Sequence, residues 1–282
     1  DAPATTTTSD NGGKKLKNLK VNLIFWGDAW NQSPAPNPDL GIIVNDAAAI
    51  ISSSYLSAVG QYGAGTAFLG GVFITPGSNP PTNYTMSDVN DRILSAIEAG
   101  SLPEPDEEST DNLHVVFMPP GTTPPPNLGG EHSYGEFTDY DFPFDLDWKD
   151  RTHTAWVMFA SRASISSIFS HELVEAMTDA EGDGVQVDPR NSSAWNEIGD
   201  ICSSTGIVNG VTVQSYWSQQ DQACIIPTQR RLEMEITCIH KMPRNDIFFP
   251  IKKVGGMNRT TNQRFVMTRD ECIRSIDRGN HF

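Results

Sequence analysis

Apolar residues recur with two different periods along residues 19–226, and these periods predict alternating strands and helices. Short, largely apolar runs bounded by Gly, Pro or Asn are typical of buried strands, and they occur at residues 19–26, 68–75, 113–118 and 155–160. Between the runs, apolar residues three or four positions apart predict helices at 46–59 and 87–99. Asn209 and Gly210 separate two short apolar segments and predict a hairpin turn. We expect an α/β (α+β) fold with helices packed on a mixed β-sheet.

A third helix is predicted to begin at Ser161 or Ser164, either of which can serve as its N-cap. Its apolar residues recur at every fourth position and form one packing stripe: Ile165, Phe169, Leu173 and Met177. His171 and Glu175 lie roughly opposite that stripe on a helical wheel. A polar pair in this position is either a solvent-exposed face or part of a functional site.

The functional interpretation rests on the segment from His171 to Glu175, which reads H-E-x-x-E. It differs by one residue from the H-E-x-x-H motif of zinc peptidases. His171 and Glu175 are one helical turn apart and share a face, so both can bind one metal ion. Glu172 lies beside them, where a carboxylate can act as general base toward water. We therefore expect zinc at His171 and Glu175, Glu172 as the catalytic base, and a zincin-like fold around this helix.

A catalytic zinc site needs a third protein ligand, and several acidic or imidazole side chains could supply it. In order of preference, the candidates are Asp200, Glu197, His132 and Asp179. The first two belong to a glycine-containing segment that can fold back toward the helix. A ligand set with two carboxylates makes zinc a weaker Lewis acid, and it favours a harder ion such as calcium.

A second acidic segment follows the helix and resembles the start of a calcium-binding loop. Carboxylates stand at positions 1, 3 and 5 and Gly184 at position 6, but Arg190 occupies position 12, where such loops carry a bidentate Glu. The candidate calcium ligands are Asp179, Glu181, Asp183 and Asp188. The alternative is an acidic turn that binds no ion.

The charge and the cysteines narrow the choice of partners and compartment. A net charge of −15 disfavours nucleic acid and anionic membranes and suits a cation-binding protein. No apolar run is long enough to predict a membrane span. The four cysteines contain no C-x-x-C pair, so a thiolate zinc site is not expected. Cys202 and Cys224 fall in one region, where they either form a disulfide or remain free thiols.

The composition changes near residue 229, because residues 230–282 hold 11 of the 20 Lys and Arg. We therefore expect a flexible N-terminus at 1–18, a main domain at 19–228 and a small C-terminal domain at 229–282. The small domain should have a β-β-β-α order, with strands at 232–240, 247–254 and 264–267 and a helix opened by a capping box at 268–271. A unit of this size has little core of its own, so it should dock on the main domain or on a partner.

Taken together, the motifs of the main domain resemble those of the phosphate-induced, or Exordium-like, family of plant extracellular proteins and its bacterial and fungal relatives. The segments that carry the resemblance are 55–63, 93–103, 114–121, 170–179, 195–202 and 214–218. The resemblance implies a zincin-type metal site at His171, Glu172, Glu175, Glu197 and Asp200, and a disulfide between Cys202 and Cys224. Ala180, where relatives tend to have proline, is a departure. The tail is similar to a small bacterial domain of unknown function, which indicates a bacterial source.

The leading functional expectation is a secreted zinc-dependent hydrolase, a metallopeptidase that uses metal-activated water. The alternative is a non-catalytic secreted binding or toxin-like protein with a structural metal, either zinc or calcium. A third interpretation is a calcium-stabilised interaction protein centred on residues 179–188. The expected partners are peptides, proteins or ligands of the cell wall or cell surface, and not nucleic acid.

Overall fold

The computed structural model describes residues 6–75, 77–102, 111–140, 147–187, 196–228, 253–257 and 264–268. The chain divides into two compact units, Asp1–Thr228 and Gln229–Phe282, which are described separately below. The first unit contains the H-E-x-x-E helix and the cavity around it.

The first unit is built on a five-stranded mixed sheet with the strand order β3-β2-β4-β6-β5. Its strands are β2 (Asn18–Trp26), β3 (Thr66–Thr75), β4 (Asn112–Phe117), β5 (Gly130–Tyr140) and β6 (Asp147–Val157). β3, β2, β4 and β6 are parallel, and β5 is antiparallel to β6 at one edge. The prediction of a mixed α/β fold is therefore confirmed.

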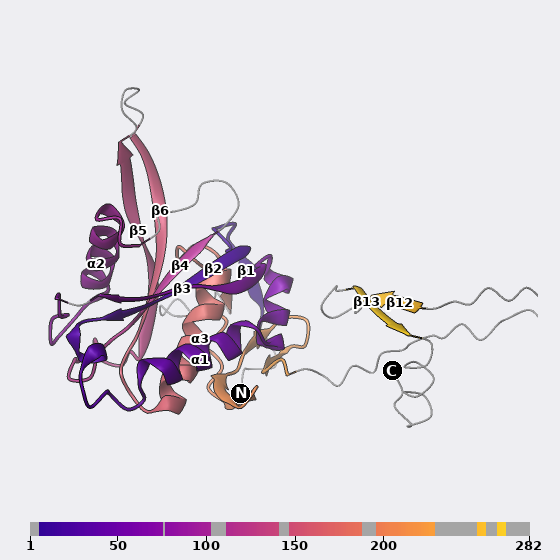
Figure 1. Cartoon of the computed structure of the whole chain (residues 1–282). Coiled ribbons are helices and arrows are strands. Elements are labelled where there is room, and N and C mark those ends of the chain that lie inside the picture. Colours follow the sequence, from indigo (N-terminus) through magenta and orange to yellow (C-terminus); the bar gives the residue numbers. More distant parts are fainter. Residues whose placement is uncertain are drawn as a thin grey trace, which may run out of the picture. The chain divides into compact units, whose positions relative to one another are not determined.

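Helices cover both faces of this sheet, as Figure 1 shows. The helix α2 (Met86–Glu98) packs on one face, over a cluster that includes Ile24, Val116 and Trp156. The other face carries α1 (Leu40–Ile51), the 3-10 helix η2 (Ser54–Tyr62) and α3 (Arg162–Thr178). A further short 3-10 helix, η1 (Asp28–Asn31), follows β2. Because parallel strands are buried on both faces, β2 and β4 read as the nearly continuous apolar runs from which they were predicted.

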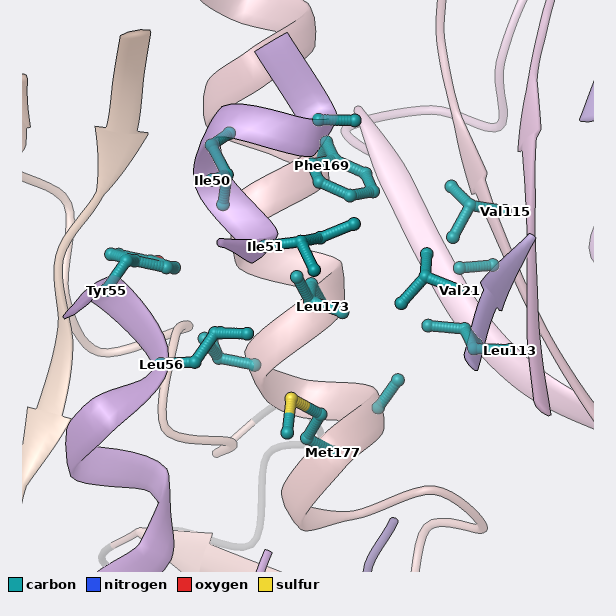
Figure 2. Packing of buried hydrophobic residues seen from close by; sticks show 14 of the residues in the cluster. Val21, Ile50, Ile51, Tyr55, Leu56, Leu113, Val115, Phe169, Leu173 and Met177 are labelled. Atoms are coloured by element: carbon teal, nitrogen blue, oxygen red, sulfur yellow. The ribbon is translucent and has the colours of Figure 1, made fainter. Parts of the chain in front are cut away.

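The helix α3 lies at the centre of the larger core. Figure 2 shows Phe169, Leu173 and Met177 on the side of α3 that packs against the neighbouring helices and the sheet. This confirms the predicted packing stripe. The opposite side is not a solvent-exposed polar face, since Glu172 and Glu175 are only 4% and 2% exposed. Two buried carboxylates on one helix need partners, and these partners form the candidate site.

The start of α1 differs from the helix predicted at 46–59. Asp39 caps α1 by accepting a hydrogen bond from the main-chain N of Ile42. Asp46 therefore lies inside the helix, where its buried carboxylate accepts two hydrogen bonds from Arg162 at the start of α3. The helix α2 is capped by Thr85, in a capping box with Asp88. The cap of α3 is Ser161, one of the two predicted residues.

The hairpin of β5 and β6 is the largest feature that the sequence pattern did not predict. β6 is longer than the predicted strand at 155–160, and β5 was not predicted at all. Figure 1 shows the two strands as a long ribbon that extends beyond the rest of the sheet. β5 is the edge strand and contains many polar residues, so it lacks the apolar run that marks a buried strand.

Short two-stranded sheets complete the first unit. β8 (Thr205–Val208) and β9 (Val211–Gln214) form the predicted hairpin, and Asn209 and Gly210 at its turn both have positive φ, as such a turn requires. β10 (Tyr216–Ser218) pairs with β11 (Ala223–Ile225). β1 (Thr8–Asp10), within the segment predicted to be flexible, pairs with β7 (Val185–Val187).

In the second unit, β12 (Lys253–Met257) and β13 (Arg264–Thr268) form an antiparallel pair. The predicted strand at 232–240, most of the strand at 247–254 and the helix that the capping box would open lie outside the described residues, as do Cys238 and Cys272.

No single helix among the described residues is long and apolar enough to cross a membrane. α1 and η2 together reach that length and apolarity, but they meet at a bend of 54° and their apolar side chains lie in the core.

Candidate metal centre

A cavity of about 740 Å³ opens between α3, β5 and the segment 196–200. It is lined by the H-E-x-x-E residues, by β5, by the loop before β5 and by the turn after α3. The acidic and histidine side chains that line it are Glu131, His132, His171, Glu172, Glu175, Asp179, Glu181, Glu197 and Asp200.

The helix α3 supplies the closest pair in the cavity. His171 Nε2 lies 3.0 Å from Glu175 Oε2 and 3.9 Å from Glu172 Oε1. The spacing of four residues places His171 and Glu175 on one face, as the sequence predicts. Glu172 is turned toward β5 and lies beside the pair.

The segment 197–200 folds back onto α3 and brings a third donor. The main-chain N of Gly199 donates a hydrogen bond to Glu175 Oε1 at 3.1 Å, which leaves Oε2 directed toward the cavity. A Cβ atom on Gly199 would lie 2.6 Å from Glu175 Oε1 and 2.7 Å from His171 Nδ1, so a larger residue here would displace these two side chains. The next residue, Asp200, places Oδ1 3.7 Å from His171 Nε2.

The edge strand β5 brings His132 into the same cavity. Its Nε2 lies 3.0 Å from the main-chain O of Asp179 and can donate a hydrogen bond to it. Its Nδ1 then offers a lone pair toward α3, at 3.5 Å from Glu172 Oε2 and 4.0 Å from Glu175 Oε2. Glu197 Oε1 lies 3.4 Å from Nε2. The structure thus places the first three of the four candidates for the third ligand, Asp200, Glu197 and His132, around one cavity.

Gln214 at the end of β9 holds the far side of the His171 ring. Its Nε2 lies 2.8 Å from His171 Nδ1 and donates to the main-chain O atoms of Cys202 and Gly199, at 2.8 and 3.1 Å. Its main-chain N donates to Ser170 Oγ at 2.9 Å. Nε2 is the ring nitrogen that faces the carboxylates of the cavity.

The residues present fit a divalent metal ion. Two overlapping groups have one donor atom per residue, with all atoms of a group within 4.8 Å of one another: His171, Glu175 and Asp200, and His132, Glu172 and Glu175. Ligands that bind a tetrahedral zinc ion at about 2.0–2.2 Å are about 3.3–3.6 Å apart, so small side-chain movements would suffice. Imidazole nitrogens with carboxylate oxygens form a donor set that suits zinc and other divalent ions.

The titration of these groups reflects the crowding of buried carboxylates. Burial alone would lower the pKa of His171, but Glu175, Glu172 and Asp200 outweigh it and raise that pKa. The same competition, with Glu197 as the main opposing charge, raises the pKa of His132. Burial also raises the pKa of the Glu175 carboxyl, against the opposing effect of His171. The cavity therefore holds protons that a divalent ion would replace.

The acidic turn after α3 has a different arrangement from the predicted calcium loop. Asp179 Oδ1 accepts a hydrogen bond from the main-chain N of Gly184 at 2.6 Å. Glu181 points to Arg151 and His153 and forms ion pairs with both. Among the described residues, the groups that could surround one ion include neither of these carboxylates nor Asp183. Asp188 lies outside the described residues, so the calcium site stays a prediction.

Cys202 and Cys224 form a disulfide, with an S–S distance of 2.04 Å, so of the two alternatives left open by the sequence the paired form is present. The bond ties the end of the segment 197–202 to β11. A disulfide is compatible with an oxidising compartment.

Comparison of the chain with protein-family models, curated proteins and solved structures finds no match. The resemblance to the Exordium-like family therefore stays a prediction. The site has to be interpreted from its own chemistry.

Proposed function

We propose that the protein is a zinc-dependent hydrolase that cleaves peptide bonds, secreted and zincin-like in its use of an H-E-x-x-E helix. The observation that carries the proposal is the convergence of His171 Nε2, Glu175 Oε2 and Asp200 Oδ1 on one side of a cavity, with a further carboxylate beside them. A zinc ion held by these three residues would supply Lewis acidity, which polarises a carbonyl group and acidifies water.

Glu172 is the residue best suited to transfer a proton from the attacking water to the leaving amine. Its side chain is 5% exposed, and its oxygens lie 3.5 Å from His132 Nδ1 and 3.9 Å from His171 Nε2. Both distances exceed those of a close hydrogen bond, so the carboxylate is not locked by a partner. It can accept a proton from water and return it to the leaving amine.

The wall of the cavity suits an extended peptide. Along the described residues, β5 pairs only with β6, so its outer edge keeps main-chain N–H and C=O groups for a further strand. Glu131 and His132 point to opposite faces of β5, yet both line the cavity, so the cavity follows this edge. A peptide added to the edge would place its main chain beside α3.

The test is hydrolysis of a diverse peptide library by the zinc-loaded protein. Glu172→Gln keeps the shape of the side chain and removes its basicity, so we expect cleavage to fall about 100-fold or more with the zinc ion at His171, Glu175 and Asp200 retained. Glu98→Gln, at the exposed end of α2, is the matched control and should cleave like the wild type.

Undiminished cleavage by Glu172→Gln would contradict the proposed base. Bound zinc without cleavage of any peptide would instead favour the alternative, a non-catalytic binding protein in which chelation lowers the melting temperature.

A further inference from the structure

Four of the carboxylates that line the cavity lie close to its two imidazoles, and together they carry more negative charge than one divalent ion can neutralise. Glu172, Glu175, Glu197 and Asp200 all lie within 4 Å of an imidazole nitrogen. Among the described residues, no Lys or Arg forms an ion pair with any of them. Glu172 and Glu175 are buried, and two imidazoles are the nearest groups that could offset the charge of the four carboxylates, so a cation at each imidazole would stabilise the set more than one ion alone.

The donor atoms separate into two centres that share Glu175. The first centre is His171, Glu175 and Asp200, and the second is His132, Glu172 and Glu175. Glu175 Oε2 lies 3.0 Å from His171 Nε2 and 4.0 Å from His132 Nδ1, so this one oxygen faces both imidazoles. Its other oxygen is held by the main-chain N of Gly199. A carboxylate oxygen between two sets of donors is suited to bridge two ions.

Two further contacts indicate that the second centre is built for a ligand. His132 is fixed through Nε2 by the main-chain O of Asp179, and its Nδ1 lies 3.5 Å from Glu172 Oε2. Gly130 lets β5 approach α3, because a Cβ atom there would lie 2.5 Å from Glu172 Oε1. A buried imidazole and a buried carboxylate therefore face each other at a distance longer than a good hydrogen bond.

We propose that the cavity binds two divalent cations, the second held by His132 Nδ1, Glu172 Oε2 and the shared Glu175 Oε2. The inference rests on the proposed cation at the first centre and adds a second ion beside it. The two ions together match the charge of the four carboxylates. Glu172 Oε1 still faces His171 and the first centre, so the proposed proton transfer by Glu172 is retained. In such paired sites the ions lie about 3.5–4 Å apart, which a shared oxygen allows.

The experiment measures bound metal per chain. The full-length protein, with its disulfide intact, is stripped with a chelator, equilibrated with Zn²⁺ at fixed free concentrations, and assayed for zinc content by elemental analysis. We expect about two ions per wild-type chain and about one per chain in His132→Ala. Ser133→Ala, the next residue of β5 and also on the cavity wall, is the matched control and should keep both ions.

Mn²⁺ supplies a second measurement. Two ions that share an oxygen give an exchange-coupled paramagnetic resonance spectrum in the wild type, and we expect a spectrum of isolated ions in His132→Ala. Should His132→Ala fail to fold, as judged by near-ultraviolet circular dichroism, His132→Gln replaces it.

The outcomes separate this inference from the proposed function. One ion per chain in both wild type and His132→Ala would overturn the second centre and leave the proposed hydrolase standing. Two ions in both proteins would overturn the assignment to His132. No bound ion in the wild type would overturn both proposals.

Discussion

Histidines on the two faces of the sheet have pKa values shifted in opposite directions. On the α2 face, His114 is fully buried, and neither ring nitrogen has a hydrogen-bond partner among the described residues. Burial lowers its pKa to about 4, so this imidazole stays neutral. On the α3 face, the carboxylates around His171 reverse the effect of burial and raise its pKa. The same side chain is thus a neutral core residue on one face and part of a charged cluster on the other.

The difference shows that burial alone does not mark a functional histidine. What distinguishes His171 is the set of donor atoms around Nε2 and the contact of Gln214 with Nδ1 on the other side of the ring. His153 is an intermediate case: it contacts Glu181, but Arg151 pairs with the same carboxylate, so no further cation is needed there.

The largest expected effect comes from substituting His171, with a substitution of His114 as the comparison. His171→Ala removes a ligand of the first centre, and we expect its zinc affinity to fall by more than about 100-fold, the upper end of what loss of a supporting residue costs. His114→Gln should bind zinc like the wild type. Competition with a chromophoric chelator measures both affinities. Equal losses of zinc affinity in the two variants would mean that His171 is no more important for zinc binding than His114.

A second prediction concerns the stability conferred by the neutral histidine. The folded pKa of His114 is about 4 and its unfolded value is 6.5. Because the unfolded chain binds the proton more readily, stability is lost as the pH falls from about 6.5 toward 4, by about 3 kcal/mol from this group.

Urea unfolding of the wild type and His114→Gln at pH 7 and pH 4 tests this expectation. The variant should lose about 3 kcal/mol less between the two pH values. Parallel losses in both proteins would show that His114 does not carry the effect.

A smaller effect is expected for the residue that orients His171. Gln214→Leu removes the contact with Nδ1 and the hydrogen bonds to the two main-chain carbonyls. Loss of a residue that contacts a metal ligand lowers metal affinity by about 10–100-fold. Gln186→Leu, elsewhere on the cavity wall, is the control and should keep the affinity. An unchanged metal affinity in Gln214→Leu would mean that Gln214 does not support metal binding by His171.

The parts of the site that follow from local periodicity could be predicted from the sequence. The shared face of His171 and Glu175, the cap at Ser161 and the turn at Asn209 and Gly210 all depend on neighbouring residues. The position of His132 could not be predicted in the same way, because it depends on the antiparallel pairing of a polar edge strand.

Long-range contacts also explain the other differences. Gln214 is 43 residues from His171 along the chain, and no local pattern connects the two. Asp46 has the residue type of a helix cap, but Arg162, 116 residues away, holds it inside α1. At Asp46, a distant charged partner therefore outweighed the local preference for a cap position.

The central claim is that His171, Glu175 and Asp200 bind a metal ion together. The most direct measurement is anomalous X-ray diffraction at the zinc edge from crystals of the zinc-loaded protein. We expect a peak about 2.0–2.2 Å from His171 Nε2 and from the Glu175 and Asp200 carboxylates. A cavity without a peak at saturating zinc, or a peak only at the acidic turn of Asp179 and Asp183, would contradict it.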